Sequence, residues 1–230
     1  QAPANDEGVP EQIPAVMGEV DVLRAVLSLP GVKSVGEAST GINVRGGATD
    51  QNLILFNDLN IYNPSHLFGF FSAFNADLIK NVELYKSGIP AEYGGRISSV
   101  LDVTTREGNK RKWGGSGGIS PITGRFALEG PIVKDKSSFL IGGRSTYSDW
   151  ILKQLSSSQI KNSEASFYDL NLNISHEINT KNNIYASGYI SKDRFKLQGD
   201  TSYRYSNKVI SAKWRHIFSN KFFNLHKILK

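Results

Sequence analysis

The second half of the chain alternates between apolar and polar residues, one position at a time. From Tyr168 to Ile178 the apolar residues fall on even positions, and the polar residues from Asp169 to Ser175 fall on odd ones. Similar alternation runs from Ile210 to Phe218, and a shorter stretch surrounds Phe126 and Leu128. Because successive side chains of a strand point to opposite faces, this period predicts β-strands with one apolar and one polar face. We expect about six such strands between residues 113 and 218.

The lengths of these strands and of their connections favour a membrane protein. Each segment has roughly ten residues, the length that a tilted strand needs to cross a bilayer. Pro121–Ile122 and Asn179–Asn182 are expected to form tight turns, whereas the connection from Ser148 to Ala165 is long and polar. Short turns at one end and long loops at the other are typical of outer-membrane barrels. A soluble antiparallel sandwich, with one face in its own core, remains the alternative.

The first half has a different pattern, mixed α and β. Residues 20–29 are expected to form a helix, with Asp21 favouring its start and Pro30–Gly31 ending it. A shorter helix is expected over residues 75–79. Asn57–Asp58 is expected to turn the chain after a buried strand. The expected strands of this half are 42–46, 53–56, 82–85 and 100–103. The polar stretch 106–112 is expected to form the linker to the second half.

Composition excludes several classes of function. The chain has no cysteine, so thiolate catalysis, zinc–thiolate sites and disulfides are absent. No apolar run approaches the roughly 18 residues of a membrane-spanning helix. The net charge of +6 is dispersed over the sequence. Without a basic helix or an aromatic stacking platform, we expect no nucleic-acid binding.

Catalytic signals are also missing. The four histidines, His66, His176, His216 and His226, have no metal-ligand neighbours at useful spacing. The chain contains neither a nucleophile elbow nor a phosphate-binding loop. The glycine-rich stretch 114–118 lacks the strand and helix of a dinucleotide site. We therefore expect no enzyme activity, no metal site and no cofactor.

Three stretches resemble, in order and spacing, the plug domain of TonB-dependent outer-membrane receptors. They are GINVRGG at 41–47, IKNVELYKSG at 79–88 and AEYGGRISSVLDV at 91–103. A fourth stretch, NPSHLFGFF at 63–71, resembles receptors of the Bacteroidetes type. The resemblance implies an α+β plug domain followed by antiparallel β-strands of an incomplete transmembrane β-barrel. Its expected parts are an N-terminal extended segment (1–18), the plug (19–109) and the first six or so barrel strands (110–230).

The resemblance also implies function and partners. Such a chain would be a fragment of a transporter in the cell outer membrane, its plug gating active uptake of a siderophore, vitamin, glycan or peptide. The implied partners are the remainder of the β-barrel, a TonB-type energy-coupling protein, outer-membrane lipid and, for some cargoes, a surface lipoprotein. One alternative is a stand-alone plug-like protein that occludes another pore or binds a partner. A second is a soluble basic binding module.

The family implies three groups of site residues. Arg45, Glu83 and Arg96 would belong to a charge network between plug and barrel. The alternative for Arg45 is a surface arginine at a strand end, and for Glu83 a solvated strand position is equally plausible. A loop would face the substrate, although core packing is the more favoured role for its aromatic residues; its candidates are Tyr62, His66, Phe68, Phe70 and Phe71. The motif glycines are expected to serve backbone geometry rather than substrate contact. They are Gly46, Gly47, Gly88, Gly94 and Gly95.

The sequence departs from the family at both ends. Residues 1–14 show neither a signal peptide nor a convincing TonB box, the segment that pairs with the coupling protein by strand addition. The first plug strand is not evident either. Residues 224–230 lose the barrel alternation and suit neither a girdle-ended strand nor a natural turn, which suggests a truncation or an altered reading frame near there. Six strands cannot close a barrel of about 22, so we expect no transport by this chain alone.

Overall fold

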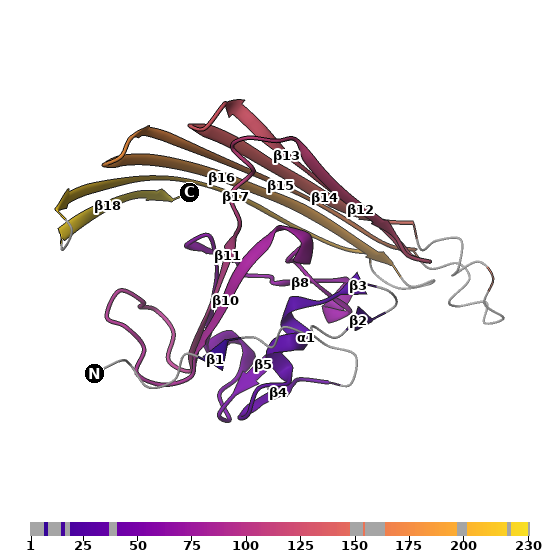
Figure 1. Ribbon diagram of the computed structural model, residues 1–230. Coiled ribbons are helices and arrows are strands. Elements are labelled where there is room, and N and C mark those ends of the chain that lie inside the picture. The colour runs from indigo at the N-terminus through magenta and orange to yellow at the C-terminus, as the bar shows by residue number, and fades with distance from the viewer. Residues whose placement is uncertain are drawn as a thin grey trace.

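The computed structural model contains two bodies, a mixed α/β body and a broad curved sheet that lies over it (Figure 1). It describes residues 7–8, 15–16, 19–36, 41–147, 154, 164–196, 202–219 and 222–229. The described residues from 7 to 105 form the mixed body, and strands β12 to β18 form the large sheet. Residues 106–113 connect the two.

The mixed body is built on a five-stranded sheet with the order β1-β10-β11-β6-β7. Its strands are β1 (Glu7–Gly8), β6 (Asn52–Phe56), β7 (Leu59–Asn60), β10 (Ile79–Tyr85) and β11 (Ser99–Thr105). β11 runs parallel to β6, and the other pairs are antiparallel. The sequence predicted β6, β10 and β11 close to these bounds. Asn57 and Asp58 both adopt positive φ, which confirms the expected turn between β6 and β7.

Smaller elements surround this sheet. Three two-stranded pairs are β2 (Ala15–Val16) with β3 (Glu19–Val20), β4 (Val32–Ser34) with β5 (Ile42–Val44), and β8 (Ser65–His66) with β9 (Phe71–Ser72). Three 3-10 turns are η1 (Thr49–Gln51), η2 (Leu67–Gly69) and η3 (Ala76–Leu78). The expected second helix, over residues 75–79, is η3.

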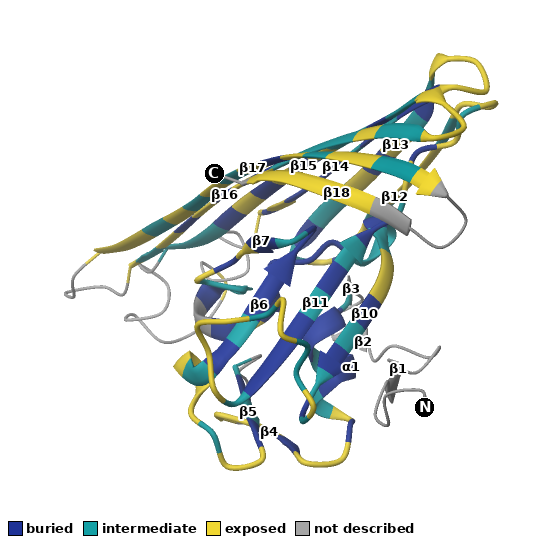
Figure 2. Ribbon diagram, turned by 90° about the vertical axis from the view of Figure 1, so that its left-hand side faces the viewer, coloured by how far each residue is buried: buried dark blue, intermediate teal, exposed yellow. Residues whose placement is uncertain are grey.

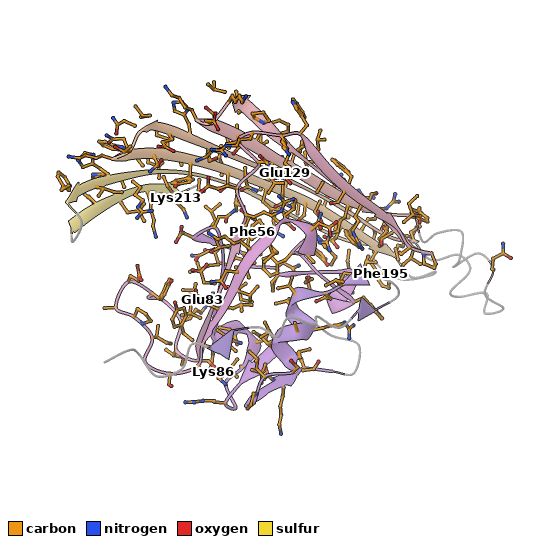
Figure 3. All side chains as sticks on the ribbon, in the orientation of Figure 1. Phe56, Glu83, Lys86, Glu129, Phe195 and Lys213 are labelled. Carbon is orange, nitrogen blue, oxygen red and sulfur yellow. The ribbon has the colours of Figure 1, made fainter. Side chains whose placement is uncertain are left out.

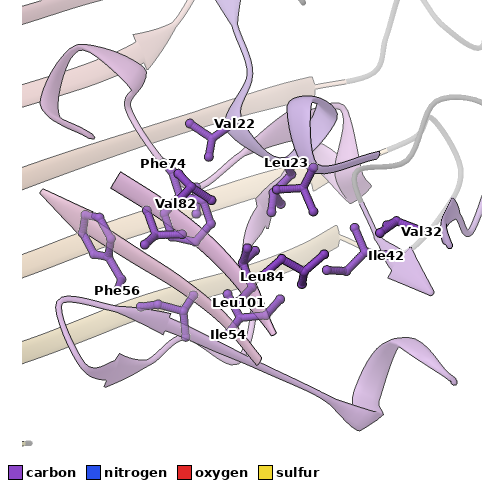
Figure 4. Packing of buried hydrophobic residues seen from close by; sticks show 14 of the residues in the cluster. Val22, Leu23, Val32, Ile42, Ile54, Phe56, Phe74, Val82, Leu84 and Leu101 are labelled. Atoms are coloured by element: carbon purple, nitrogen blue, oxygen red, sulfur yellow. The ribbon is translucent and has the colours of Figure 1, made fainter. Parts of the chain in front are cut away.

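Helix α1 (Val22–Leu27) lies within the predicted range. The Asp21 side chain caps it by accepting a hydrogen bond from the Arg24 amide at 3.1 Å. The apolar face of α1 packs on the five-stranded sheet, where Leu23, Phe74 and Leu101 are fully buried (Figure 4). No helix among the described residues is long and apolar enough to cross a membrane.

The large sheet is an antiparallel meander in chain order, β12 to β18. Its strands are β12 (Gly114–Ile119), β13 (Thr123–Val133), β14 (Ser137–Thr146), β15 (Glu164–Asn179), β16 (Asn182–Lys196), β17 (Ser202–Ser219) and β18 (Phe222–Leu229). The six strands expected between residues 113 and 218 are confirmed. β15, β16 and β17 have 16, 15 and 18 residues, so they exceed the expected ten.

The interpretation of the last residues was wrong. Residues 224–230 were expected to suit neither a girdle-ended strand nor a natural turn, yet β18 pairs with β17 from Phe222 to Leu229. β17 presents a long row of free backbone donors and acceptors, and pairing with it satisfies the backbone of the next segment. Strand formation at this place therefore does not depend on alternating side chains.

The two faces of the large sheet are chemically opposite. The face toward the mixed body carries buried polar groups such as Arg144, Asp169 and Asn171. The other face exposes apolar side chains such as Leu170, Leu172 and Ile210, and Figure 2 shows the resulting alternation of buried and exposed residues along the strands. A soluble sandwich would bury its apolar face. Because the described strands expose theirs, they do not form a soluble sandwich.

Candidate functional site

The mixed body meets the large sheet through a buried charged cluster centred on His66. The imidazole Nδ1 lies 2.8 Å from Oδ2 of Asp193 on β16, and Nε2 lies 3.3 Å from Oδ2 of Asp169 on β15. Asp193 Oδ1 also accepts a hydrogen bond from the Leu67 amide at 3.1 Å. The ring of Phe167 stacks on the imidazole at 4.2 Å between centroids. His66 is therefore fixed on three sides by the sheet.

Arg144 on β14 completes this cluster. Its guanidinium contacts Oδ2 of Asp169, with Nη2 at 2.7 Å and Nε at 2.9 Å. The same Nη2 donates to the Ser72 carbonyl of the mixed body at 2.8 Å. Both charged side chains are almost fully buried. Buried charges are tolerated only when they are paired and hydrogen-bonded, and here each has such partners.

Strand register and a short hairpin bring these residues together. Arg144 pairs directly with Asp169 across β14 and β15, and both lie on the polar parity of their strands. In the mixed body, β8 and β9 pair Ser65 with Ser72 and His66 with Phe71, which places His66 just before the turn of the hairpin. The Asp21 carboxylate accepts the Ser72 amide at 2.6 Å, which anchors the hairpin to the start of α1.

The surroundings of His66 favour its protonated form. Burial alone would lower the pKa of the imidazole, but the hydrogen bonds to Asp169 and Asp193 and the negative charges of these two groups raise it above its ordinary value of 6.5. The proton is therefore held more tightly where the body and the sheet are in contact than it would be in water.

A second contact lies at the turn between β6 and β7. Asp58 forms ion pairs with Lys213 on β17 and with Lys227 on β18, the latter at 2.8 Å. Burial would raise the pKa of Asp58, but hydrogen bonds and the charges of both lysines lower it below 3.8. Beside it, the side-chain Nδ2 of Asn57 donates a hydrogen bond to Asn173 Oδ1 at 3.2 Å.

A third contact lies near the linker. Arg125 on β13 donates to Oδ2 of Asp77 at 3.0 Å, and Arg106 pairs with Glu129 at 2.7 Å. Gly108 packs so tightly against β14 that an added Cβ would lie 2.0 Å from the Phe139 carbonyl oxygen. A cavity of about 260 Å³ remains between the linker, β11 and strands β15 to β17, and its lining includes Asn173, Ser187 and Arg215.

The predicted charge-network residues do not belong to these contacts. Arg45 and Arg96 are exposed, and Arg96 bonds to the Gly95 carbonyl. Glu83 accepts a hydrogen bond from Tyr85 at 2.6 Å within β10 (Figure 3). None of the three forms an ion pair with the described strands of the large sheet. Their role in a network with a barrel wall stays a prediction.

The motif glycines differ in what they require. Gly46, Gly88 and Gly95 adopt positive φ, which glycine accepts without strain. Gly47 lies against Ser98, where no Cβ fits, whereas Gly94 has open space around it.

The predicted substrate-facing residues separate into two groups. Tyr62 and Phe70 are exposed, by 81% and 46%. His66 and Phe71 are buried between the mixed body and the sheet, so they do not face solvent in this structure. Phe68 belongs to η2, and the position of its side chain lies outside what the structure describes.

Sequence reasoning missed the sheet's part of the cluster. The available signal was the presence of ionisable residues on the polar face of strands whose other face was expected to contact lipid. These residues are Arg144, Asp169 and Asp193. Among the described residues, no group of three or more His, Asp or Glu side chains could hold a metal ion.

A family model matches the first part of the chain. Residues 4–100 match the family model described as TonB-dependent Receptor Plug Domain. No curated protein is similar enough to count as a match.

Solved structures of receptors and transporters share the fold. A ferric enterobactin receptor mutant of Pseudomonas aeruginosa, in complex with enterobactin, superposes with a TM-score of 0.65 and 16% sequence identity. The match covers 91% of this chain and 38% of the receptor chain. The siderophore receptor PirA of Acinetobacter baumannii superposes with a TM-score of 0.64 and 17% sequence identity, and the match covers 91% of this chain and 36% of PirA. The copper transporter OprC superposes with a TM-score of 0.64 and 9% sequence identity, and the match covers 90% of this chain and 33% of OprC. The chain thus spans about a third of the length of these structures.

Proposed function

We propose that this chain, whose residues 4–100 match the plug domain of TonB-dependent receptors, is a section of a TonB-dependent outer-membrane transporter. The mixed body is the plug, and β12 to β18 are strands of the barrel wall. The plug would gate active uptake through the closed barrel of the whole protein. The cargo belongs to the classes that such receptors take up: siderophores, vitamins, glycans or peptides.

One observation carries the proposal. The polar face of the large sheet is turned toward the plug, and its apolar face is turned away. A wall that has lipid outside and a plugged, hydrated lumen inside needs this polarity. The alternative of a stand-alone plug-like protein requires the apolar face after Trp113 to be buried by its own chain, and side chains such as Leu172 and Trp214 are exposed instead.

The contacts suit a plug that has to move. The plug meets the wall through ion pairs and hydrogen bonds at His66, Asp58 and Asp77. When such groups separate, water can satisfy them, so a polar interface opens more easily than a dry apolar one. Uptake would then require displacement of the plug and no covalent chemistry.

The implied partners follow from the same proposal. The remaining barrel strands would close the wall, and outer-membrane lipid would cover its apolar face. A TonB-type protein would supply the force by pairing with an extended segment of the transporter. The stretch from Asn63 to Phe71 supports a receptor of the Bacteroidetes type, in which a surface lipoprotein is a further partner.

Single cysteine variants of the whole transporter test the wall assignment, because this chain has no cysteine of its own. A spin label at Leu172→Cys should be accessible to oxygen dissolved in lipid. The same label at the neighbouring Asn171→Cys should be shielded from lipid, because Asn171 faces the plug. Ready access of a water-soluble relaxation agent to residue 172, or equal accessibility of both positions to oxygen in the lipid, would refute the proposal.

A further inference from the structure

The His66 cluster has one member from the plug and three from the wall. We define it as His66, Arg144, Asp169 and Asp193, of which none is more than 4% exposed. Its wall residues come from three consecutive strands, β14, β15 and β16. Every direct contact of the imidazole with a charged group therefore crosses between plug and wall.

The charge of the cluster balances only with a proton on His66. The imidazolium and the Arg144 guanidinium then face the carboxylates of Asp169 and Asp193, and the sum is zero. When His66 is neutral, the cluster keeps one carboxylate charge without a counterion. A buried charge without its partner strongly destabilises the arrangement that buries it. Undocking of the plug would relieve this by exposing the carboxylates to water.

We infer that His66 is a proton-dependent latch, which holds the plug on the barrel wall while it is protonated and loosens it when the proton leaves. The inference rests on the proposed function, since it needs the mixed body to be a plug and the sheet to be its wall. It adds a regulation of docking that the fold alone does not imply.

The contacts around the ring transmit this change to the plug backbone. Asp193 binds the imidazole with one oxygen and the Leu67 amide with the other. Phe167 lies nearly parallel to the imidazole, at 6° between planes, so the ring cannot turn toward water without leaving the wall. Other polar groups nearby support the hairpin: Tyr205 on β17 donates to the Ser65 carbonyl at 3.3 Å, and Asp21 accepts the Ser72 amide.

The direction of the pH effect follows from linkage. Docking raises the pKa of His66 above its ordinary value of 6.5, despite the opposing effect of burial. The docked state therefore binds the proton more tightly than the undocked state. The contribution of His66 to docking is complete below the ordinary value and disappears as the pH rises through the raised one.

Amide hydrogen exchange in the whole transporter, held in lipid nanodiscs, measures the latch. Protection of residues 61–74, corrected for the intrinsic exchange rate, is followed from about pH 5 to about pH 9, on both sides of the ordinary histidine value. It should fall on the order of tenfold for each unit by which docking raises the pKa. In a background that carries Asp102→Asn, which removes the separate titration of that plug carboxyl, protection of residues 100–103 in the plug core should stay constant.

Two variants separate the latch from a merely structural role. His66→Gln cannot carry a proton and should lose the pH dependence, with low protection throughout. Asp193→Asn leaves Arg144 and Asp169 balanced when His66 is neutral and adds an unpaired positive charge when His66 is protonated. The fall of protection with rising pH should therefore disappear or reverse in this variant. The matched control is His176→Gln, because His176 bonds to Ser137 within the sheet, and its pH dependence should equal that of the unsubstituted protein.

A flat pH profile of the unsubstituted protein, or an unchanged slope in His66→Gln or Asp193→Asn, would overturn the latch. Energy-dependent uptake by cells and the spin-label contrast between residues 171 and 172 test the proposed function separately. If these two fail while the pH profile persists, the transporter assignment is wrong and the titrating contact remains.

Discussion

Nδ1 of His66 lies 2.8 Å from Oδ2 of Asp193, although 127 residues separate the two in sequence. The contact joins strand β8 of the mixed body to strand β16 of the large sheet. Close to it, Tyr189 of the sheet is buried against Phe56 of the mixed body, with ring centroids 5.6 Å apart. Docking therefore combines aromatic contacts with several charged ones, and the charged ones allow the sharper tests.

Removal of the Arg144 guanidinium should undock the plug. In Arg144→Ala, Asp169 loses its counterion and the Ser72 carbonyl loses its donor. Breaking a buried pair from one side costs about 3–5 kcal/mol, so urea should release the plug at a clearly lower concentration. Arg111→Ala is the control, since its pair with Asp135 is largely exposed and contributes about 0–1 kcal/mol. Similar midpoints for both variants would contradict the buried cluster.

Charged substitutions on the outer face should show a dependence on depth. Leu172 lies in the middle of β15, and Ile178 lies beside the turn to β16. In a bilayer, Leu172→Arg should destabilise the folded barrel by about 2–4 kcal/mol and Ile178→Arg by about 0–1 kcal/mol. Urea titration of the whole protein folded into lipid vesicles measures both. Equal effects would mean that this face does not lie in lipid.

The plug should lose stability as the pH rises through the titration of Asp102. Burial raises the pKa of this carboxyl from 3.8 to about 6, and the charges of Asp58 and Glu83 add to the effect. The folded plug thus binds the proton more tightly, and the contribution is complete below 3.8 and lost as the pH rises through about 6. The loss should reach at most about 3 kcal/mol.

Asp102→Asn tests this prediction, because an amide stays neutral at every pH and can still accept the hydrogen bond from Tyr93. Its unfolding free energy should be independent of pH over this range and should exceed that of the unsubstituted plug near neutral pH. Asp50→Asn, at an exposed position, should leave the pH dependence unchanged. A persistent slope in Asp102→Asn would assign the effect to another group.

The sequence predicted elements whose signal is local. The alternation from Tyr168 to Ile178 gave strand and face together, and Asp21 with Pro30–Gly31 marked both ends of helix α1. Strand β18 was missed because its formation depends on the free edge of β17 rather than on its own pattern. Lengths were underestimated for β15 to β17, since inter-strand pairing continues beyond the alternating stretch.

The candidate site was less accessible from sequence. The motif around His66 was visible, but its partners lie on three strands and meet only through register. A buried ion pair leaves no periodic signal, because one charged residue on a polar face looks like any other. Arg45, Glu83 and Arg96 came from the family resemblance, and their predicted network stays untested by the strands present here.

Glycine substitutions should show that the linker is clamped to the wall. Gly108 is buried, and an added Cβ would lie 2.0 Å from the Phe139 carbonyl oxygen and 2.6 Å from its carbon. β14 is paired on both sides, so this backbone cannot retreat. Gly108→Ala should therefore push the linker off the sheet and cost about 1–3 kcal/mol or more.

Substitutions at Gly94 and Gly95 of the plug separate the steric clash at Gly108 from the effects of backbone strain and of an added methyl group. Gly94→Ala meets open space at an ordinary φ and should change the stability by less than about 0.5 kcal/mol. Gly95→Ala also meets open space, but at a φ of +84°, so backbone strain alone should cost roughly 1–2 kcal/mol. Thermal unfolding ranks the three variants, and hydrogen exchange of residues 106–112 should rise only in Gly108→Ala. Unchanged exchange there would show that the linker does not depend on its contact with β14.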